Sequence, residues 1–391
     1  MKILSVNAGS SSLKFTLFEL PEEKPLISGY FERIGLNNSF YTIKYNGEKY
    51  KTEIELINHQ QAFEILVQEL ENYKIVESLD EIKGVGHRVV QGGDYYNKTT
   101  IIDDEVIGRI DELTSLAPLH NPAALIGIKA SMEVIPNAVQ TAVFDTAFHQ
   151  TMPDYNYIYP VPYEWSIQYR IRKYGAHGTS HQYVSMEMNK ILGREDTKLI
   201  TCHIGSGASI SAVVNGKCLN TSMGLTPNAG VMMGTRSGDI DATIIPYMLD
   251  KSPLPTKEID RMLNKESGLL GISGISSDMR DIEVAINEGN ERCELAVKMY
   301  VRRIADYIAK YYVEMGGCDA IVLTAGVCEN AIFVRKRILN ELKVLGVVLD
   351  DEANQSHGEV ACITTSDSKI PVYVIPTDEE LMIALDTYNL I

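Results

Sequence analysis

Two arginines stand where an anionic ligand could approach them. Arg88 lies near the end of the apolar run Ile82–Val90, where a guanidinium is costly unless a ligand or a carboxylate pairs with it. A purely structural ion pair is the alternative for this residue. Arg236 lies between glycines in the polar segment Met232–Asp241, and a loop of this kind suits close approach to an anion. The two positions together favour an anionic substrate.

Asp145 and His177 are the other candidates for chemistry. Asp145 directly follows the apolar strand predicted over Gln140–Phe144, and groups just beyond strand carboxyl ends line the ligand crevice of open α/β sheets. It could hold an arginine or a metal, act as a base, or simply occupy a turn. His177 precedes a predicted helix that Thr179 or Ser180 would cap, so it lies where anions are favoured. A histidine beside a capped helix with no ligand is the alternative.

Three short polar turns follow apolar strands. They are Asn7–Ser12, after the strand predicted over Lys2–Val6, Gly205–Gly207, after that predicted over Leu199–Ile204, and the Gly-containing turn Thr324–Asn330. Turns of this kind leave backbone N–H groups exposed in a nest that suits phosphate oxygens, although plain tight turns remain the alternative. Their recurrence predicts a duplicated phosphate-binding core.

The elements that would position these residues have ordinary signals. Asn215-Gly216 predicts a two-residue hairpin turn, and apolar residues at helical spacing predict a long helix over Glu291–Met315. The Tyr/Met stripe of that helix favours the core or a subunit interface over a cofactor site. Ser267–Ser273 is expected as a Gly-rich turn, and Thr377–Glu380 as a capping box for the last helix. A ligand role for Glu379 does not follow from this pattern alone.

Composition limits the class of protein. The 391 residues exceed what one core usually holds, so two domains are expected. A net charge of −16 argues against nucleic acid as a partner. Because the protein as a whole is acidic, a phosphate ligand would have to bind a few local cations, helped by a metal. The 6 cysteines are dispersed, as expected of reduced thiols in a cytoplasmic protein. No apolar run has the length that a membrane span or a signal peptide needs.

Several blocks, in the right order along the whole chain, resemble the acetate kinase family of short-chain carboxylate kinases. They are Val6–Phe15, Gly86–Val90, Leu116–Pro122, Val143–Pro153, His177–His181, Met232–Asp241, Ser267–Gly274 and Ile375–Glu380. The resemblance implies an α/β fold of two duplicated ribonuclease H-like (actin-like ATPase) domains with an interdomain active-site cleft. Residues 1–148 plus 377–391 would form the N-terminal domain, and residues 149–376 the C-terminal nucleotide-binding and dimerisation domain.

The resemblance also implies a reaction. The γ-phosphoryl group of ATP would pass directly, in line and reversibly, to acetate, propionate or butyrate, giving ADP and an acyl phosphate such as acetyl phosphate. Mg²⁺, or Mn²⁺ in its place, would assist, and the protein would be a cytoplasmic homodimer. Because a carboxylate is already ionised at neutral pH, no general base is needed, and catalysis depends on alignment and on charge neutralisation. The alternatives are a sugar or polyol kinase, a relative with pyrophosphate or another nucleotide as phosphoryl donor, and a non-catalytic nucleotide-binding protein.

Site roles follow from the same resemblance. The catalytic residues would be Arg88 and Arg236, which bind the carboxylate and the moving phosphoryl group, His177, which donates to its equatorial oxygens, and Asp145, which orients an arginine. Asn7 and Glu379 would help to hold Mg²⁺ through water. The acid would contact Arg88, Val90, Leu119, His120, Ala176 and Pro227. The phosphates and the nucleoside would contact Ser10, Ser12, Lys14, His203, Gly205, Ser206, Gly207, Asp278, Arg280, Gly326, Val327 and Asn330.

The chain departs from the family pattern at a few positions. Members usually carry Phe at Ala176, Asn at Ser206, Gly at Cys328, Asp at Asn220 and His at Gln91. Loss of a ring at Ala176 predicts a larger pocket, in which each additional methylene of a longer acid contributes about 0.8 kcal/mol. A side chain at Cys328 would be strained if φ were positive there, which would weaken ATP binding or change the donor. A compensated, harmless substitution is the alternative.

Overall fold

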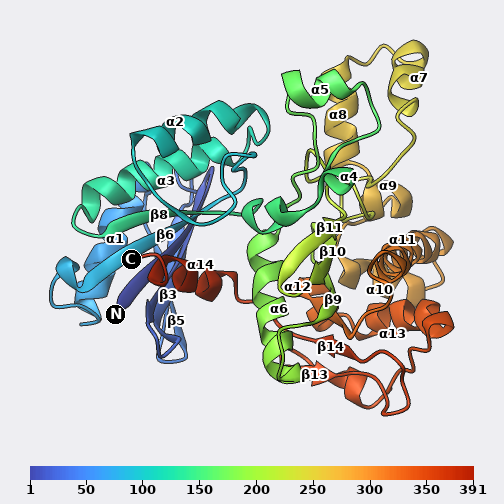
Figure 1. The fold of residues 1–391 in the computed structure, drawn as a ribbon. Helices are drawn as coiled ribbons and strands as arrows, with labels where there is room; N and C mark the ends of the chain where they lie inside the picture. Colours follow the sequence, from blue (N-terminus) through green and yellow to red (C-terminus); the bar gives the residue numbers. More distant parts are fainter. The chain divides into compact units, whose positions relative to one another are not determined.

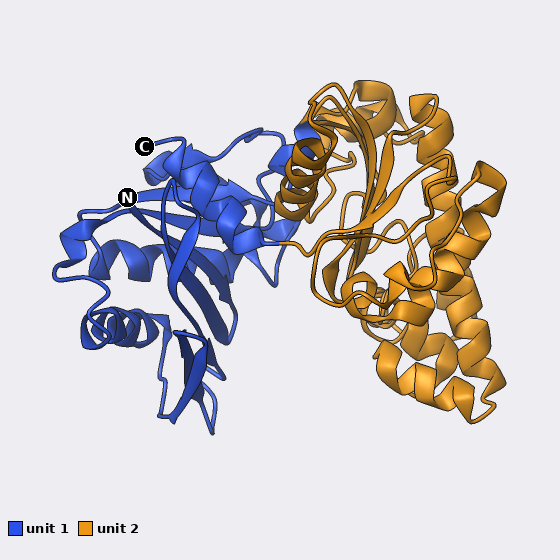
Figure 2. Cartoon of the chain, turned by 90° about the horizontal axis from the view of Figure 1, so that it is seen from below, with its two compact units in different colours: residues 1–150, 378–391 blue, residues 151–377 orange.

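Two mixed β-sheets with flanking helices make up the fold of residues 1–391, all of which the computed structural model describes (Figure 1). They belong to two compact units, coloured separately in Figure 2. Unit 1 comprises Met1–Gln150 and Asp378–Ile391, and unit 2 comprises Thr151–Thr377. The chain therefore leaves unit 1 once and returns to it for its last helix.

The sheet of unit 1 has the strand order β5-β4-β3-β2-β1-β6-β8-β7. Strands β1 to β5 form an antiparallel meander, whereas β1, β6 and β8 are parallel. The strands are β1 (Lys2–Gly9), β2 (Ser12–Glu19), β3 (Lys24–Glu32), β4 (Phe40–Tyr45), β5 (Glu48–Glu53), β6 (Ile82–Val89), β7 (Thr100–Ile101) and β8 (Val139–Phe144). The helices are α1 (His59–Asn72), α2 (Asp104–Glu112), α3 (Asn121–Val134) and α14 (Glu379–Tyr388).

Helices cover both faces of this sheet. Val85 of β6 lies in one core with Leu66 of α1 and Ala130 of α3. A side chain at Gly84 or Gly86 would instead meet Thr387 of α14 at less than 3 Å. Because successive strand residues point to opposite faces, α14 packs against the face opposite to α1 and α3. The C-terminal helix is thus a structural part of the N-terminal unit, and its first turn starts at Glu379.

The sheet of unit 2 has the order β11-β10-β9-β12-β14-β13. Strands β9 to β11 are an antiparallel meander, whereas β9, β12 and β14 are parallel. The strands are β9 (Lys198–Ile204), β10 (Ala208–Val214), β11 (Lys217–Thr221), β12 (Ala320–Thr324), β13 (Ala361–Cys362) and β14 (Val372–Val374). The helices are α4 (Asp154–Tyr157), α5 (Tyr163–Gln168), α6 (Gly178–Leu192), α7 (Ile244–Lys251), α8 (Thr256–Lys265), α9 (Gly268–Ser273), α10 (Met279–Asn287), α11 (Glu291–Met315), α12 (Ala325–Asn330) and α13 (Ile332–Glu341).

The two sheets repeat one topology. The order β3-β2-β1-β6-β8 in unit 1 corresponds to β11-β10-β9-β12-β14 in unit 2, and in each the central strand is antiparallel to one neighbour and parallel to the other. This duplication confirms the predicted α/β fold of two ribonuclease H-like domains.

Several local expectations from the sequence are wrong. Ser267–Ser273 contains the helix α9 rather than a turn, and the third predicted polar turn is mostly the short helix α12. His177, with φ of 59°, is the N-cap residue of α6, so that Thr179 and Ser180 lie inside the helix. Asp378 rather than Thr377 caps α14 by accepting from the backbone N–H of Leu381 at 2.9 Å.

Much of the Tyr/Met stripe of α11 belongs to the core. Tyr300, Tyr311 and Met315 are buried among apolar residues of unit 2, whereas Tyr307 and Tyr312 are half-buried and pack against that core. No helix of the chain combines the length and apolar character needed to cross a bilayer.

Candidate functional site

Arg88 and Asp145 form a paired unit at the carboxyl ends of two parallel strands. β6 and β8 are hydrogen-bonded neighbours, so the residue that follows β8 comes to lie beside the end of β6. Arg88 donates from Nε to Oδ1 of Asp145 at 3.0 Å and from Nη2 to Oδ2 at 2.7 Å. Asp145 is only 1% exposed and raises the pKa of Arg88, which therefore remains a cation.

The first turn of α14 brings two more carboxylates to this place. Oε2 of Glu379 lies 3.9 Å from Nε of Arg88, and Glu380 forms an ion pair with Lys14 of β2. Burial raises the pKa of Glu379. The positive charge of Arg88 partly opposes this rise, whereas the negative charges of Asp145 and Glu380 add to it. The positive charges of Arg88 and Lys14 therefore offset the effect of burial only in part.

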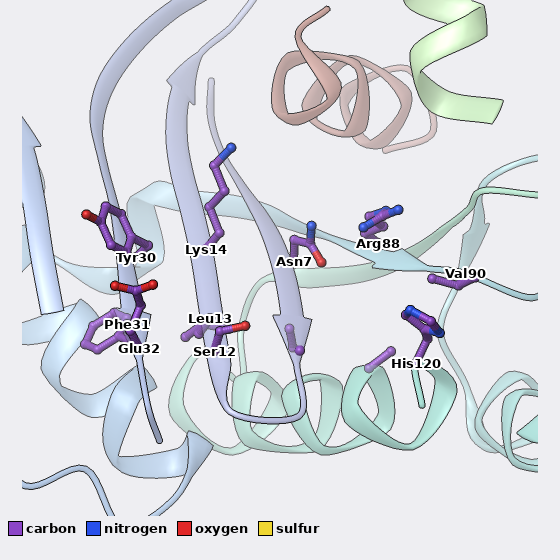
Figure 3. A pocket seen from close by; sticks show the side chains of 13 residues that line it. Asn7, Ser12, Leu13, Lys14, Tyr30, Phe31, Glu32, Arg88, Val90 and His120 are labelled. Carbon is purple, nitrogen blue, oxygen red and sulfur yellow. The ribbon is translucent and has the colours of Figure 1, made fainter. Parts of the chain in front are cut away.

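A pocket of about 340 Å³ opens beside Arg88 in unit 1 (Figure 3). Of the predicted site residues it gathers Asn7, Ser12, Lys14, Arg88, Val90 and His120. It does not include Ser10 or Leu119, and Leu119 is 65% exposed.

Tyr30 and Glu32 of β3 also line this pocket, although no sequence motif marks either residue. The β2–β3 register places Tyr30 opposite Lys14 and Glu32 opposite Ser12. The only available signal was this strand pairing, since neither residue stands near a predicted turn.

Asn7 and Glu379 fit the needs of Mg²⁺. This ion takes oxygen ligands and usually keeps several waters, with one or two carboxylates and substrate phosphates completing its shell. No group of three or more His, Cys, Asp or Glu side chains forms a closed protein cage in this chain. An amide oxygen and a half-buried carboxylate with a raised pKa are instead suited to a cation held mainly by water and phosphate.

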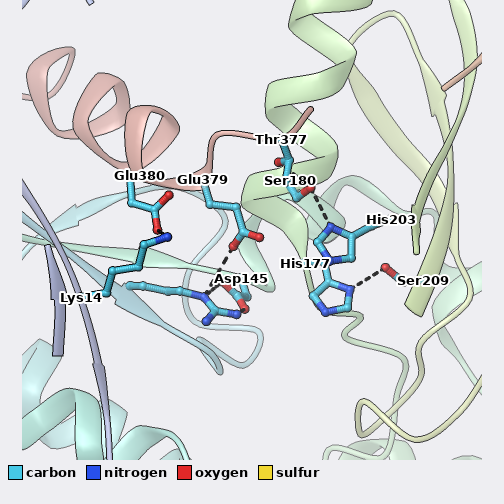
Figure 4. A network of polar contacts seen from close by, with 10 residues as sticks. Lys14, Asp145, His177, Ser180, His203, Ser209, Thr377, Glu379 and Glu380 are labelled. Atoms are coloured by element: carbon cyan, nitrogen blue, oxygen red, sulfur yellow. Dashed lines mark hydrogen bonds and ion pairs between the residues drawn. The ribbon is translucent and has the colours of Figure 1, made fainter. Parts of the chain in front are cut away.

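In unit 2, three histidines meet around Ser209 of β10. The Oγ of Ser209 lies 2.9 Å from Nδ1 of His177 and 2.8 Å from Nε2 of His181. The ring of His203 stacks on that of His177, with centroids 4.0 Å apart (Figure 4). Because β9 and β10 pair His203 with Ser209, the sheet register sets this geometry.

Arg236 and Gly207 lie beside the same histidine. A Cβ on Gly207 would stand 3.3 Å from Nη1 of Arg236 and 3.6 Å from the His177 ring. Nη1 of Arg236 donates to the carbonyl of Pro227 at 3.1 Å, and burial alone lowers the pKa of Arg236. The predicted turn Gly205–Gly207 thus lies against a cation and an imidazole.

The residues predicted to contact the nucleoside lie on two helices of unit 2. Asp278 caps α10 and pairs with Arg280 at 2.6 Å, which lowers the pKa of Asp278 to about 2. Gly326 and Asn330 are exposed on α12, and Val327 is half-buried.

The strain considered for Cys328 is absent. Cys328 is buried within α12, and neither it nor Ser206 has a positive φ. Ala325 instead has a φ of 68° at the start of that helix. The substituted positions therefore impose no left-handed backbone on a side chain.

Comparison with known proteins shows the family of the chain. The model of the Acetokinase family matches residues 2–385. The chain belongs to the acetokinase family. It is 51% identical over 395 residues to the acetate kinase of Clostridium novyi (strain NT), covering 100% of this chain and 98% of that protein. The acetate kinase of Bacillus subtilis (strain 168) is 51% identical over 391 residues, with 100% and 99% covered.

Solved structures of acetokinase relatives share the fold. A crystal structure of Porphyromonas gingivalis acetate kinase has a TM-score of 0.94 and 44% identity, with 100% of this chain and 99% of that chain covered. A propionate kinase from Francisella tularensis has a TM-score of 0.94 and 42% identity over the whole of both chains. Membership of the acetokinase family and the actin-like ATPase fold are therefore confirmed.

Proposed function

We propose that this acetokinase transfers the γ-phosphoryl group of ATP to the carboxylate of acetate or a close homologue, reversibly, giving an acyl phosphate and ADP. Full-length similarity to acetate kinases, at 51% identity, is the observation that carries this function. The comparisons give no support to another phosphoryl donor or to a non-catalytic role.

In unit 1, Arg88 would bind the acid and help to neutralise the phosphoryl group. Asp145 occupies Nε and Nη2 of the guanidinium, which leaves Nη1 to donate to the substrate. A guanidinium fixed on one edge loses little freedom when it binds an anion with the other. Val90 and His120, which line the same pocket, would contact the acid.

In unit 2, the hydrogen bonds around Ser209 suit His177 to donation. If the Ser209 hydroxyl donates to Nδ1 of His177, the neutral ring carries its proton on Nε2. Nε2 of His181 then donates to Ser209, and Nδ1 of His181 accepts from the Thr201 hydroxyl at 2.7 Å. His177 would thus offer an N–H to an equatorial phosphoryl oxygen, beside the guanidinium of Arg236.

These groups would act without a general base, because the attacking carboxylate is already charged. Their contribution is alignment and neutralisation of charge in the transition state, where one arginine can contribute about 10³-fold in rate. Phosphates would lie along Ser10, Ser12, Lys14, His203 and the turn Gly205–Gly207. The nucleoside would lie near Asp278, Arg280 and α12.

We further infer Mg²⁺ at Asn7 and Glu379, where it would neutralise charge on the phosphates when bound. Mn²⁺ would substitute for it. A homodimer formed through unit 2 and a cytoplasmic location rest on the family resemblance alone.

Hydroxylamine trapping of the acyl phosphate, with acetate, propionate and butyrate as acceptors and with ATP, GTP and pyrophosphate as donors, tests this function. We expect turnover with ATP and Mg²⁺ and, because Ala176 replaces a ring, relatively better use of propionate than a Phe at that position allows. Nucleotide binding without any trapped product would refute the kinase function. A strict preference for acetate would refute only the larger pocket.

A further inference from the structure

One carboxylate oxygen of Glu329 joins two distant segments of unit 2. Its Oε1 accepts from the backbone N–H of Ala325 at 2.8 Å, from the Thr324 hydroxyl at 3.2 Å and from the backbone N–H of Thr377 at 3.1 Å. Thr324 and Ala325 stand where β12 ends and α12 begins, whereas Thr377 is the last residue of unit 2. Glu329 itself belongs to α12.

Thr377 continues this connection toward the histidines. Its Oγ1 lies 2.8 Å from the hydroxyl of Ser180 in α6, and that hydroxyl lies 2.8 Å from Nδ1 of His203. His203 in turn stacks on His177. An unbroken series of contacts within unit 2 thus runs from α12 through Glu329, Thr377 and Ser180 to the imidazole proposed to donate to the phosphoryl group.

The short helix α12 is held firmly at its other end. Arg335 is fully buried and donates from Nη1 to the carbonyls of Cys328 and Glu329 at 2.9 and 3.0 Å. At the first end, the left-handed Ala325 depends on Glu329 for the partner of its N–H. A displacement of α12 therefore carries the Glu329 carboxylate with it and alters its hydrogen bond to Thr377.

We propose that Glu329 is a positioning residue that couples nucleotide occupancy of α12 to Thr377 and, through Ser180, to the His203–His177 pair. The inference rests on the proposed nucleotide contacts at Gly326, Val327 and Asn330, which lie on the same six-residue helix.

Hydrogen exchange measured by mass spectrometry on the full chain, with and without ADP and Mg²⁺, tests the coupling without requiring turnover. In the unaltered protein we expect ADP to slow exchange in peptides covering residues 324–330 and also in those covering 375–378. In Glu329→Ala, ADP should protect only the first set. Glu329→Gln keeps an acceptor of the same reach and should preserve both responses. Protection of residues 375–378 that persists in Glu329→Ala would overturn the proposal.

Kinetics provide a second readout, with Glu341→Ala as the matched control. Glu341 is the last residue of α13, the helix that follows α12, and its carboxylate forms an exposed ion pair with Arg302 of α11. We expect Glu329→Ala to raise KM for ATP and to lower kcat at least about tenfold, whereas Glu329→Gln and Glu341→Ala stay within about twofold. A merely structural role would lower the melting temperature and the active fraction but leave KM for ATP unchanged.

A double-variant comparison separates coupling from independent damage. If the contacts act as one series, Glu329→Ala combined with Ser180→Ala should lose no more kcat than the worse single variant. Independent effects would multiply, and that result would overturn the proposal. If the unaltered protein traps no acyl phosphate at all, the kinase function fails, while the exchange experiment still decides the coupling.

Discussion

Asp145→Asn removes the charge that holds Arg88 and leaves its bidentate contact incomplete. Asp145 is 1% exposed, and removing one partner from a buried ion pair typically costs about 3–5 kcal/mol. The Arg88 side chain is 22% exposed, and Glu379 lies 3.9 Å from its Nε, so water and a second carboxylate remain for the guanidinium. We therefore expect the free energy of unfolding to fall by the lower value, about 3 kcal/mol.

The same substitution should lower catalysis. If that energy is what fixes Arg88 against the substrate, a loss of about 3 kcal/mol corresponds to about 10²-fold in kcat/KM for the acid. Urea unfolding measures the first quantity, and hydroxylamine trapping of the acyl phosphate measures the second.

Glu258→Gln is the matched control. Arg261 donates to Glu258 at 2.9 and 2.7 Å with the same two-bond geometry, but both side chains are well exposed. We expect that variant to lose less than about 1 kcal/mol and to keep its activity. If Asp145→Asn loses no more stability than Glu258→Gln and retains its kcat/KM, Asp145 does not hold Arg88 in place for the substrate. A loss of stability with unchanged kcat/KM would reduce the pair to a structural role.

Three further predictions concern single side chains. Burial raises the pKa of Glu379 above its ordinary 4.5, so the folded state binds more protons than the unfolded chain, and the free energy of unfolding falls as pH rises through the raised value. Urea titrations of Glu379→Gln at several pH values should lack this fall. In the same variant, Mg²⁺ should no longer stabilise the ADP complex. Burial lowers the pKa of Lys173 from 10.5 to about 8, so the unfolded chain binds more protons between these values and stability should rise with pH there; an equal rise in Lys173→Met would contradict this. Ser209→Ala removes the hydroxyl between His177 and His181, and kcat should fall about 5- to 10-fold with KM for ATP unchanged in steady-state assays; an unaltered kcat would mean that this hydroxyl does not orient His177.

Local sequence signals were enough for much of the scaffold. The Asn215-Gly216 turn has φ values of 51° and 72°, as expected of the residues that best tolerate a left-handed backbone. The long helix has the predicted bounds Glu291–Met315 and ends in the left-handed Gly316. Strands β8 and β9 agree with their predicted ranges, Gln140–Phe144 and Leu199–Ile204, within one residue. All of these depend on interactions between near neighbours in the chain.

Helix starts were predicted less well. Thr179 and Ser180 have the side chains of good N-caps, yet the chain enters α6 through a left-handed His177. The hydroxyl of Ser180 contacts Thr377 and His203 instead. Distant partners here outweigh the local preference for capping, and no pattern within the segment records them.

By itself, the sequence predicted a duplicated core from its recurring strand-and-turn pattern, supplied the residue types available for anion binding and, through ordered motifs, indicated the family. Only the tertiary structure decided which partner each charge has. From the sequence, Asp145 could have held a metal, served as a base or lain in a turn. It meets Arg88, 57 residues away in the chain, because β6 and β8 run side by side in parallel. Tyr30 and Glu32 reach the pocket for the same reason. The register between β2 and β3 places them beside Lys14 and Ser12, and the order of residues along β3 alone does not specify these neighbours.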